Sequence, residues 1–365
     1  MTQQAINPPA TEGDPLLTER IVSSTIGALE LFTVHIGRAL GLYDSLTQGP
    51  VTFPELAARA GIAPRYAREW LEQQAAAGLV AASTDESPEG RTYELPAAHQ
   101  AVLLDPTDPA HVGPLADMVA GIAGVLDRLP AAFRTGDGVP YADYGAAFRH
   151  GQGAINRPTF VRDLPVWLAE LSQVTGRLAS TAVARVADLG CGIGWSTIAL
   201  AEARPWAFID GYDSDPASIH EARLNAADAG LGDRVNFHVV DASDSTALAD
   251  PYDLVLIFEA LHDMARPVEV LRAARSALGI GGVVLVVDER VAERFTAPGD
   301  DVERLMWGWS VNHCLPAALA EAPSAALGTV LRPATVHHLA SQAGFASTQE
   351  LPPRHDFFRL YLMSD

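Results

Sequence analysis

This 365-residue chain contains few cysteines, no long apolar runs and few basic residues. Its two cysteines are too few for a disulfide framework, so we expect a reducing, cytoplasmic location. No apolar run reaches the roughly eighteen residues of a membrane span, and the N-terminus does not resemble a secretion signal. Acidic residues outnumber basic ones by 45 to 25, and the net charge of −20 disfavours nucleic acid and membranes as partners. Composition therefore predicts a cytoplasmic protein that acts on a small molecule.

The chain is long enough for two domains and a sizeable core. Residues 1–15 are rich in proline and polar residues and predict a flexible leader. Residues 16–105 predict a small, mostly helical domain, and residues 106–180 predict a helical linker that caps the C-terminal domain. Residues 181–365 predict that this C-terminal domain is of the α/β class, with an insertion at 291–335 over its strand ends.

The N-terminal domain has the pattern of a winged helix-turn-helix. A helix expected over 24–46 is apolar on all sides, so it must be buried against its own domain or against a partner subunit. Residues 52–61 and 64–78 predict two short helices, each stopped by a glycine. Two short strands around a polar tip at 83–90 would form the wing.

A DNA-binding role for this motif is the less favoured interpretation. The second helix balances Arg65 and Arg68 with Glu69 and Glu72, and the wing region adds glutamates at positions 86, 89 and 94. A DNA-binding surface needs a basic face to neutralise phosphates. We therefore expect a scaffold for dimerisation and for covering an active site.

From about residue 181 apolar strand candidates alternate with helical stretches. This alternation predicts a parallel, doubly wound, Rossmann-like sheet. Two candidates near the C-terminus would complete it. The expected strands are 183–189, 207–212, 235–240, 254–258, 283–287, 345–350 and 357–363.

A glycine-rich turn follows the first of these strands. Asp188 opens the pattern D-x-G-x-G-x-G, which ends at Gly194 before a helix. Glycines allow a sharp turn and a close approach of the backbone to a ligand. The dinucleotide fingerprint would need its third glycine at position 195, where Trp195 stands. An acid in a loop without basic residues suits a cationic ligand, so the turn predicts the nucleoside loop of S-adenosylmethionine (SAM).

Acidic residues end three consecutive strands, where ligands of open α/β sheets bind. Asp188 ends the first strand, Asp213 follows the second and Asp241 follows the third. A carboxylate at Asp213 can accept hydrogen bonds from both ribose hydroxyls, and Asp241 is placed for the adenine amino group. Each acid alone could be a helix cap or a solvated strand end. Together with the glycine turn, they favour SAM.

With these motifs, residues 181–289 resemble the class I SAM-dependent methyltransferases. Including the winged helix, the chain is similar to the small-molecule O-methyltransferases of plants and actinobacteria, above all to an actinobacterial branch of unknown substrate. The resemblance implies the seven-stranded methyltransferase sheet, S-adenosylhomocysteine (SAH) as product, and a homodimer joined by N-terminal helices. The cofactor contacts that it implies are Asp188, Gly190, Gly192, Gly194, Asp213, Ser214, Asp241, Ala242 and Glu259.

His262 is the candidate base. It lies just past the fourth strand and precedes Asp263, as in the His-Asp pair of the similar O-methyltransferases. An imidazole titrates near neutrality, so it can take the proton of a hydroxyl during methyl transfer. Asp288, at the end of the fifth strand, would orient the ring where the family usually has glutamate. The family has another glutamate before its last helix, but residues 328–333 contain no acid here. Alternatively, His262 only packs or hydrogen-bonds at this place.

The insertion supplies the candidate acceptor pocket. Trp307, Asn312 and His313, together with Tyr144, interleave aromatic and polar groups as a pocket for a flat or polyketide-like substrate does. A helix that packs on the core would have the same pattern. From the middle segment, residues 149, 156 and 157 could close the pocket.

The chain's histidines do not predict a metal site. His262, His313 and the pair His337 and His338 lack the spacing of metal ligands, so we expect none.

These observations predict transfer of a methyl group from SAM to a small-molecule hydroxyl, with His262 as general base and Asp288 as its orienting residue. Because the family's additional acid is missing, methylation at carbon or nitrogen, or a non-methylating reaction on the same fold, remains the alternative. A SAM-sensing regulator that binds DNA is a weaker one.

Overall fold

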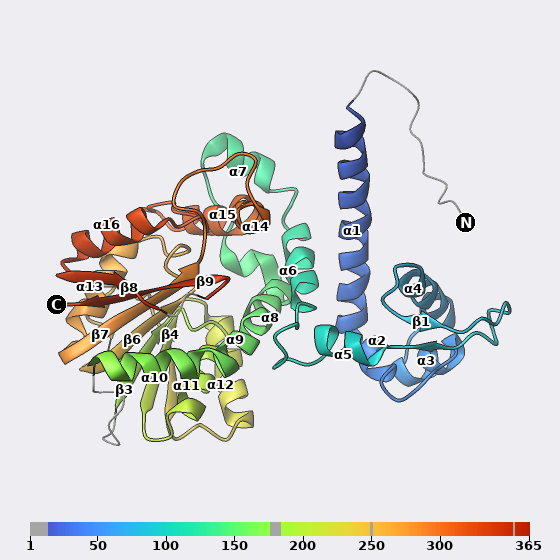
Figure 1. Cartoon of the computed structure of the whole chain (residues 1–365), viewed down its shortest axis with the longest axis horizontal. Coiled ribbons are helices and arrows are strands. Elements are labelled where there is room, and N and C mark those ends of the chain that lie inside the picture. The colour runs from blue at the N-terminus through green and yellow to red at the C-terminus, as the bar shows by residue number, and fades with distance from the viewer. Residues whose placement is uncertain (1–13, 176–183, 249–250, 353–354) are drawn as a thin grey trace. The chain divides into compact units, whose positions relative to one another are not determined.

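The computed structural model describes residues 14–175, 184–248, 251–352 and 355–365. The chain divides into two compact units, Met1–Leu104 and Asp105–Asp365 (Figure 1). Most of the predicted leader, residues 1–13, lies outside the described residues.

The first unit contains the helices and the hairpin of the predicted winged helix-turn-helix (Figure 1). In α3, Glu55 accepts from the backbone N–H of Thr52 at 2.8 Å as part of a capping box, and Gly61 ends the helix in a left-handed conformation. Pro64 begins α4, where its missing N–H costs nothing. The elements are α1 (Pro15–Ala39), α2 (Leu42–Ser45), α3 (Phe53–Ala60), α4 (Pro64–Ala76), β1 (Ala81–Ala82), β2 (Tyr93–Glu94) and α5 (Ala97–Leu103).

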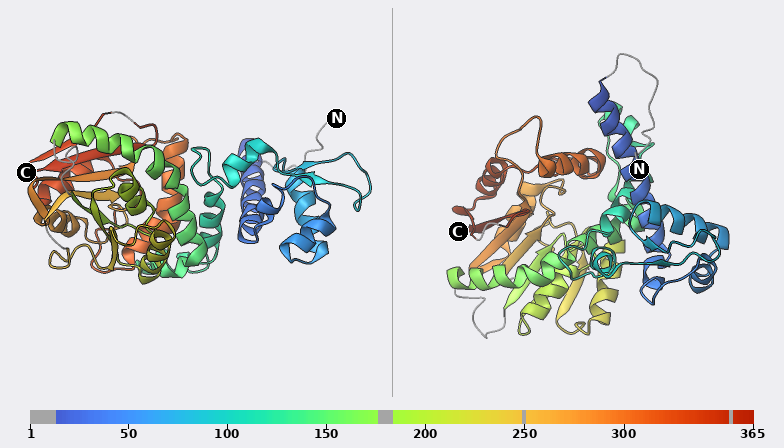
Figure 2. Two further views of the ribbon diagram at one scale, coloured as in Figure 1. Left: turned by 90° about the horizontal axis from the view of Figure 1, so that it is seen from below. Right: turned by 45° about the vertical axis from the view of Figure 1, so that its right-hand side comes forward.

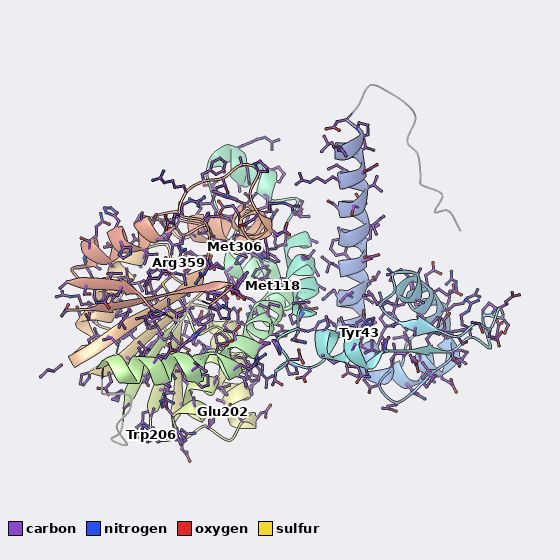
Figure 3. The ribbon with its side chains drawn as sticks, in the orientation of Figure 1. Tyr43, Met118, Glu202, Trp206, Met306 and Arg359 are labelled. Carbon is purple, nitrogen blue, oxygen red and sulfur yellow. The ribbon has the colours of Figure 1, made fainter. Side chains whose placement is uncertain are left out.

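The core of this unit forms where α1 meets α4. Tyr43 is fully buried and donates a hydrogen bond from its hydroxyl to Gln74 Oε1 at 2.5 Å (Figure 3). The indole N–H of Trp70 donates to the carbonyl of Thr33 at 2.9 Å. A Cβ on Gly37 would lie 2.5 Å from the Trp70 ring, so only glycine allows this close packing. These contacts fix the C-terminal half of α1 on the unit.

Helix α1 leaves most of its apolar side chains exposed. It begins at Pro15, well before the predicted residue 24, and Asp14 caps it by accepting from the backbone N–H of Leu16 at 2.9 Å. Only Val34 and Gly37 are buried, so packing against its own unit covers just part of it. At 25 residues α1 is long. However, neither it nor another helix of the described residues combines the length and apolarity that crossing a membrane requires.

The second unit is built on a seven-stranded sheet with the order β5-β4-β3-β6-β7-β9-β8. The pairs β3–β4, β3–β6, β4–β5 and β6–β7 are parallel, and only β9 runs against its neighbours β7 and β8. This confirms the predicted fold class. The strands are β3 (Arg185–Leu189), β4 (Phe208–Asp213), β5 (Val235–Val239), β6 (Tyr252–Phe258), β7 (Leu278–Glu289), β8 (Ser347–Glu350) and β9 (Phe358–Ser364).

Alternate residues of the central strands enter two separate cores, one on each face of the sheet. In β6, Leu254 and Leu256 join one core, whereas Val255 and Ile257 join the other. Helices cover both faces, which gives three layers (Figures 1 and 2). One face carries α10 (Leu164–Thr175), α11 (Trp195–Ala203) and α12 (Pro216–Asp228), and the other carries α13 (Pro267–Ser276) and α16 (Pro333–Ala343).

The segment before β3 and the insertion after β7 pack against each other. Tyr144 donates its hydroxyl hydrogen bond to the carbonyl of Asn312 at 2.9 Å, and the N–H of Val139 donates to the carbonyl of Pro316 at 2.9 Å. A π-helical turn, η2, connects the two helices of the insertion. The elements are α6 (Pro114–Ala123), α7 (Leu129–Thr135), η1 (Tyr141–Tyr144), α8 (Gly145–Ile155), α9 (Arg157–Arg162), α14 (Asp301–Trp309), η2 (Ser310–Cys314) and α15 (Leu315–Leu319).

Candidate active site

The glycine turn connects β3 to α11, and its glycines are needed for two different reasons. Gly194 has φ +87°, and a Cβ there would lie 2.8 Å from the Phe237 ring, so neither the conformation nor the space allows a side chain. Gly192 has φ +53° but open space around it. Its N–H donates to Asp213 Oδ2 at 2.8 Å, which ties the turn to the end of β4.

Asp188 supports the turn from below. Its carboxylate accepts hydrogen bonds from the hydroxyls of Ser196 and Thr197, both at 2.6 Å, and is 1% exposed. Burial raises the pKa of Asp188 to about 6. These bonds join the turn to the first residues of α11. Asp188 and Gly194 therefore shape the turn, and neither lines the adjoining cavity.

Asp213, at the end of β4, and Asp241, just after β5, line that cavity. Asp213 accepts backbone hydrogen bonds on both oxygens, from Gly192 at 2.8 Å and from Asp215 at 2.9 Å, and burial raises its pKa. Each oxygen keeps a lone pair for a ligand. Asp241 accepts from the Ser243 hydroxyl at 2.6 Å and pairs with Arg266. Although burial opposes it, these contacts hold the pKa of Asp241 below its usual range.

A cavity of about 400 Å³, here called the cofactor cavity, opens beyond the ends of β3, β4 and β6. Helix α8 closes it from the opposite side, in part through Arg149, which forms a buried ion pair with Asp215 at 2.8 Å. A large cleft with acids and backbone N–H groups at its rim fits an adenosyl group that carries a positive sulfonium. The predicted cofactor residues that line it are Gly190, Gly192, Asp213, Ser214, Asp241, Ala242 and Glu259.

A second cavity of about 260 Å³, the acceptor cavity, adjoins the first. Met118 on α6 and Met306 on α14 are two of its mostly apolar wall residues (Figure 3). Its polar wall includes His262 and Glu289. The two cavities share four lining residues, Gln152, Asn156, Glu259 and His313, so they meet at one boundary.

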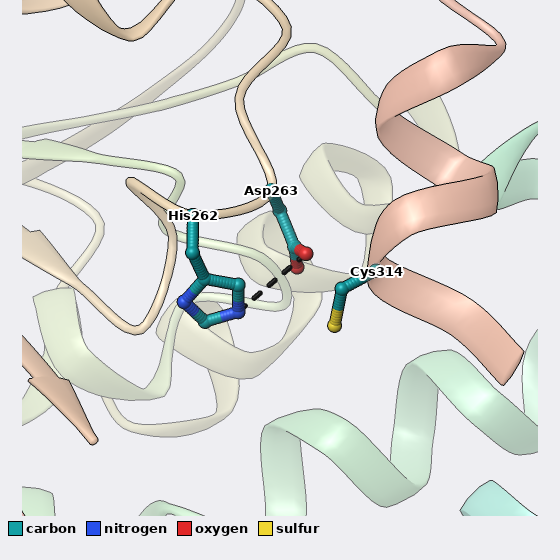
Figure 4. Close-up of side chains that lie close together, drawn as sticks. All are labelled: His262, Asp263 and Cys314. Carbon is teal, nitrogen blue, oxygen red and sulfur yellow. Dashed lines mark ion pairs between the residues drawn. The ribbon is translucent and has the colours of Figure 1, made fainter. Parts of the chain in front are cut away.

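His262 lies on the turn after β6, with its ring 3% exposed in the wall of the acceptor cavity. Its Nδ1 is 3.0 Å from Asp288 Oδ1, at the end of β7. Its Nε2 is 3.5 Å from Asp263 Oδ1 (Figure 4). Since the carboxylate of Asp288 can only accept, Nδ1 carries a hydrogen. In the neutral ring the lone pair is then on Nε2, which makes Nε2 the basic atom.

Charge around His262 favours its protonated form. Burial acts to lower the pKa of His262, but the carboxyl groups of Asp288, Asp263 and Glu289 outweigh burial and raise it well above 6.5. Burial likewise opposes ionisation of Asp288, and the His262 imidazolium reverses this and lowers the Asp288 pKa. The resting site therefore holds an imidazolium–carboxylate pair, and the ring must lose a proton before it can act as a base.

Glu289 is a site residue that the sequence did not reveal. Neighbouring residues on a strand point to opposite faces, so a site residue at position 288 does not by itself predict one at position 289. At the end of β7, Glu289 Oε2 nevertheless comes within 3.6 Å of His262 Nδ1. Burial raises the pKa of Glu289 well above its usual range. An acid therefore stands beside His262, although residues 328–333 contribute only Thr329 to the acceptor cavity.

Glu259 lies at the boundary of the two cavities in a strained backbone conformation, with φ +45°. Its N–H donates to the carbonyl of Val287 at 2.8 Å, and its carboxyl accepts from the Asn156 side chain. Burial raises the pKa of Glu259 to about 7. A side chain held this firmly between two cavities is placed to contact either ligand.

Comparison with known proteins agrees with this arrangement. Residues 180–333 match the family described as "Methyltransferase domain", and residues 27–105 match the "Rv2258c-like winged HTH domain". The chain carries a class I SAM-dependent methyltransferase domain.

Two curated relatives show how far the similarity extends. The trans-aconitate 2-methyltransferase of Streptomyces avermitilis is 37% identical over 101 residues, 28% of this chain and 37% of its own. The mitomycin biosynthesis 6-O-methyltransferase of Streptomyces lavendulae is 25% identical over 80% of this chain and 83% of its own. This chain spans only 26 to 39% of the length of the first three curated relatives it matches.

A solved structure covers nearly the whole chain. The structure of PigF with SAH has a TM-score of 0.70 and 19% identity, and the alignment covers 98% of this chain and all of that one. At this identity the match shows the fold, including the N-terminal domain.

The predicted pocket residues of the methyltransferase domain lie at different depths. His313 lines both cavities and stacks on Phe148 at 4.0 Å between ring centroids. Trp307 is 40% exposed and contacts Phe295, so Trp309, two residues further on, faces the acceptor cavity in its place. Tyr144 and Asn312 line neither cavity: the Tyr144 ring packs on the His313 ring, and its hydroxyl donates to the carbonyl of Asn312. The guanidinium of Arg157 lies over the Trp195 ring.

Two groups of side chains in the described parts of the methyltransferase domain are close enough to share a metal ion, and both include His262. One adds Asp263 and Cys314 (Figure 4), and the other adds Asp288 and Glu289. Burial raises the pKa of the Cys314 thiol to about 12, so it is protonated. A thiol and an imidazolium are poor ligands, because metal binding requires both to lose their protons. The absence of a metal stays a prediction.

Proposed function

We propose that the protein transfers the methyl group of SAM to a hydroxyl oxygen of a small molecule. The observation that carries the proposal is the shared boundary of the two cavities, with His262 in the acceptor wall next to it. Methyl transfer requires alignment of donor and acceptor, removal of a proton and exclusion of water. Two adjoining cavities would align donor and acceptor, His262 in the acceptor wall would take the proton, and the mostly apolar wall of the acceptor cavity would limit the access of water.

The residues around the cofactor cavity fit the donor. Bound SAM supplies an electrophilic methyl group on a sulfonium. Asp213 would accept hydrogen bonds from the ribose hydroxyls, because each of its oxygens has a lone pair left. Asp241 and Ala242 would hold the adenine edge, and Glu259 the methionyl end. Acidic groups and a turn without basic residues suit the positive charge of this ligand.

On the acceptor side, His262 would act as the general base. Asp288 fixes the ring through Nδ1 and stabilises the imidazolium that forms when Nε2 takes the hydroxyl proton. Methylation at nitrogen is the second candidate, since the carboxyl groups of Glu259 and Glu289 next to the acceptor cavity would also bind an amine.

Two measurements test the proposal. Calorimetry with SAH should give micromolar or tighter binding, and incubation with SAM labelled in its methyl group should place the label on a hydroxyl of an acceptor. Mass spectrometry and NMR of the product would locate it. Tight SAH binding without label transfer to a panel of phenols and amines would contradict methyl transfer and leave a SAM-binding role.

We also propose a homodimer joined through α1. Its exposed apolar residues include Val22, Ile26, Leu29, Ile36 and Leu40, whose spacing of four, three, seven and four residues is the heptad pattern of helices that pack on each other. Ile26→Glu with Leu29→Glu should give monomers in analytical ultracentrifugation, because two charges would be buried in the contact. Glu19→Gln, on the same helix, is the control. A double variant that stays dimeric would place the interface elsewhere.

A further inference from the structure

Three polar atoms in the wall of the acceptor cavity have no hydrogen-bond partner among the described residues. They are Glu289 Oε2, His313 Nε2 and Thr329 Oγ1. All three side chains are at most 6% exposed. Buried polar groups are nearly always paired, because water is no longer available to them. Glu289 Oε2 has the His262 ring 3.6 Å away, beyond hydrogen-bond distance, so all three side chains of this wall keep hydrogen-bonding capacity that a ligand in the cavity can use.

The remaining wall gives the shape and charge of that ligand. It is formed by long apolar and aromatic side chains from α6, α8 and α14, which suit a flat, apolar body: Leu115, Met118, Phe148, Ile155, Met306 and Trp309. No arginine of the described chain lines this cavity, and the sequence contains no lysine. The cationic group of this wall, His262, is already paired with Asp288.

The geometry points to Glu289 as the residue that selects the acceptor. Its carboxyl exchanges a hydrogen bond with a second polar group of an uncharged aromatic acceptor, while the reacting hydroxyl lies at His262. An acceptor with a carboxylate at that second position is disfavoured, because no free cation would replace its lost hydration. This inference rests on the proposed function and specifies its substrate class as oxygen-rich, uncharged aromatic compounds.

A binding experiment on the SAH-loaded full chain tests the selection directly. Three matched probes differ in one substituent: 2,3-dihydroxynaphthalene, 2-naphthol and 3-hydroxy-2-naphthoate. We expect calorimetry to give about tenfold tighter binding of the diol than of 2-naphthol, the gain of one buried hydrogen bond, and the weakest binding for the naphthoate. Equal binding of diol and naphthol, preference for the naphthoate, or no binding of the diol would overturn the inference.

Variants of Glu289 assign the preference to this side chain. In Glu289→Leu the diol and 2-naphthol should bind about equally, whereas Glu289→Gln should keep part of the difference, because an amide still hydrogen-bonds. Glu293→Gln, which changes an exposed glutamate in the loop that follows β7, should leave the ratio unchanged. SAH affinity reports folding, since Glu289 does not line the cofactor cavity. A full diol preference in a Glu289→Leu variant that binds SAH would overturn the assignment.

The order of the three binding affinities is measured on the wild-type protein, so the selection remains testable even if Glu289→Leu does not fold. The role of Glu289 in acceptor selection and the proposed methyl transfer can also be refuted independently of each other. A Glu289-dependent diol preference without label transfer from SAM supports the binding role and contradicts the proposed reaction. Label transfer to 2-naphthol and to the diol with equal efficiency supports the reaction and contradicts the role of Glu289.

Discussion

The two cavities of the site differ in how their polar groups are satisfied. Around the cofactor cavity, Asp213 and Asp241 already accept hydrogen bonds from the chain, and Asp188 below the turn does so too. Around the acceptor cavity, Glu289 and Thr329 each have a buried oxygen without a hydrogen-bond partner among the described residues. His313 Nε2, in the wall shared by both cavities, and Asp263 Oδ1, in the wall of the cofactor cavity, have none either. Asp213 and Asp241 are therefore held in place by the protein before any ligand binds, whereas the inferred role of Glu289 requires a bound acceptor to supply the partner of its free oxygen.

This difference is what a methyltransferase needs. The cofactor is the same in every turnover, so a rigid cradle with few alternatives lowers the cost of binding it. The acceptor decides specificity, and unpaired buried groups reject molecules that cannot pair with them. Substitutions in the cofactor half should therefore change SAH binding, whereas substitutions in the acceptor half should change turnover and selectivity.

The largest effect is expected in the acceptor half, from His262→Ala. Removing the base should lower kcat by about a hundredfold to ten-thousandfold while SAH affinity stays unchanged. Steady-state kinetics with an acceptor and calorimetry with SAH measure the two quantities. Wild-type turnover would remove His262 from the chemistry, and weakened SAH binding would break the separation of the two halves.

In the cofactor half, Asp213→Ala should weaken SAH binding by about a hundredfold, the loss of two hydrogen bonds to a carboxylate. Calorimetry measures it directly. Asp233→Ala, an exposed aspartate near β5, is the matched control and should bind SAH like the wild type. Unchanged affinity in Asp213→Ala would show that the nucleoside lies elsewhere.

The pH dependence of kcat/KM should arise from His262, in the acceptor half of the site. Because the pKa of His262 is raised above 6.5, kcat/KM should increase with pH as the imidazolium loses its proton, with a midpoint above that value. Asp288→Asn removes the carboxylate that raises the pKa and should move the midpoint to lower pH. An identical profile in both proteins would contradict the assignment of the titrating group.

The smallest effect concerns the stability of the glycine turn. Gly194→Ala should lower the free energy of unfolding by about 3 kcal/mol, because the left-handed conformation and the contact with Phe237 both oppose a side chain. Gly192→Ala meets only the conformational cost, about 1 kcal/mol, since its surroundings are open. Urea denaturation compares the two, and equal losses would contradict the packing of the turn.

Prediction from the sequence succeeded where the relevant interactions are local. The seven strand candidates are found, with ends shifted by at most two residues except in β7, which begins at Leu278, five residues earlier than expected. Alternating apolar residues and glycine and proline boundaries act within a few residues, so the sequence predicts them well. Cofactor contacts such as Asp213 are expected from the rule that ligands bind beyond strand ends. The burial expected for α1 is only partly present, since most of its apolar side chains are exposed in its own unit.

In the acceptor half, the sequence predicted some of the residues of the cavity wall but not which side chains of the insertion face the cavity. His313 was expected in the pocket and lines it, but Trp309 lies there and Trp307 does not. Both tryptophans lie in α14, and only the packing of this helix in the tertiary structure decides which of its faces meets the cavity.

The sequence by itself determined the wound sheet, the glycine turn and the acids at the strand ends, because each depends on the periodicity and conformational preferences of neighbouring residues. The packing of distant segments brings Glu289 to within 3.6 Å of His262 and leaves its Oε2 atom without a hydrogen-bond partner among the described residues. That arrangement depends on segments far apart in the chain, from α6 to Thr329, whose packing fixes which polar atoms remain without partners.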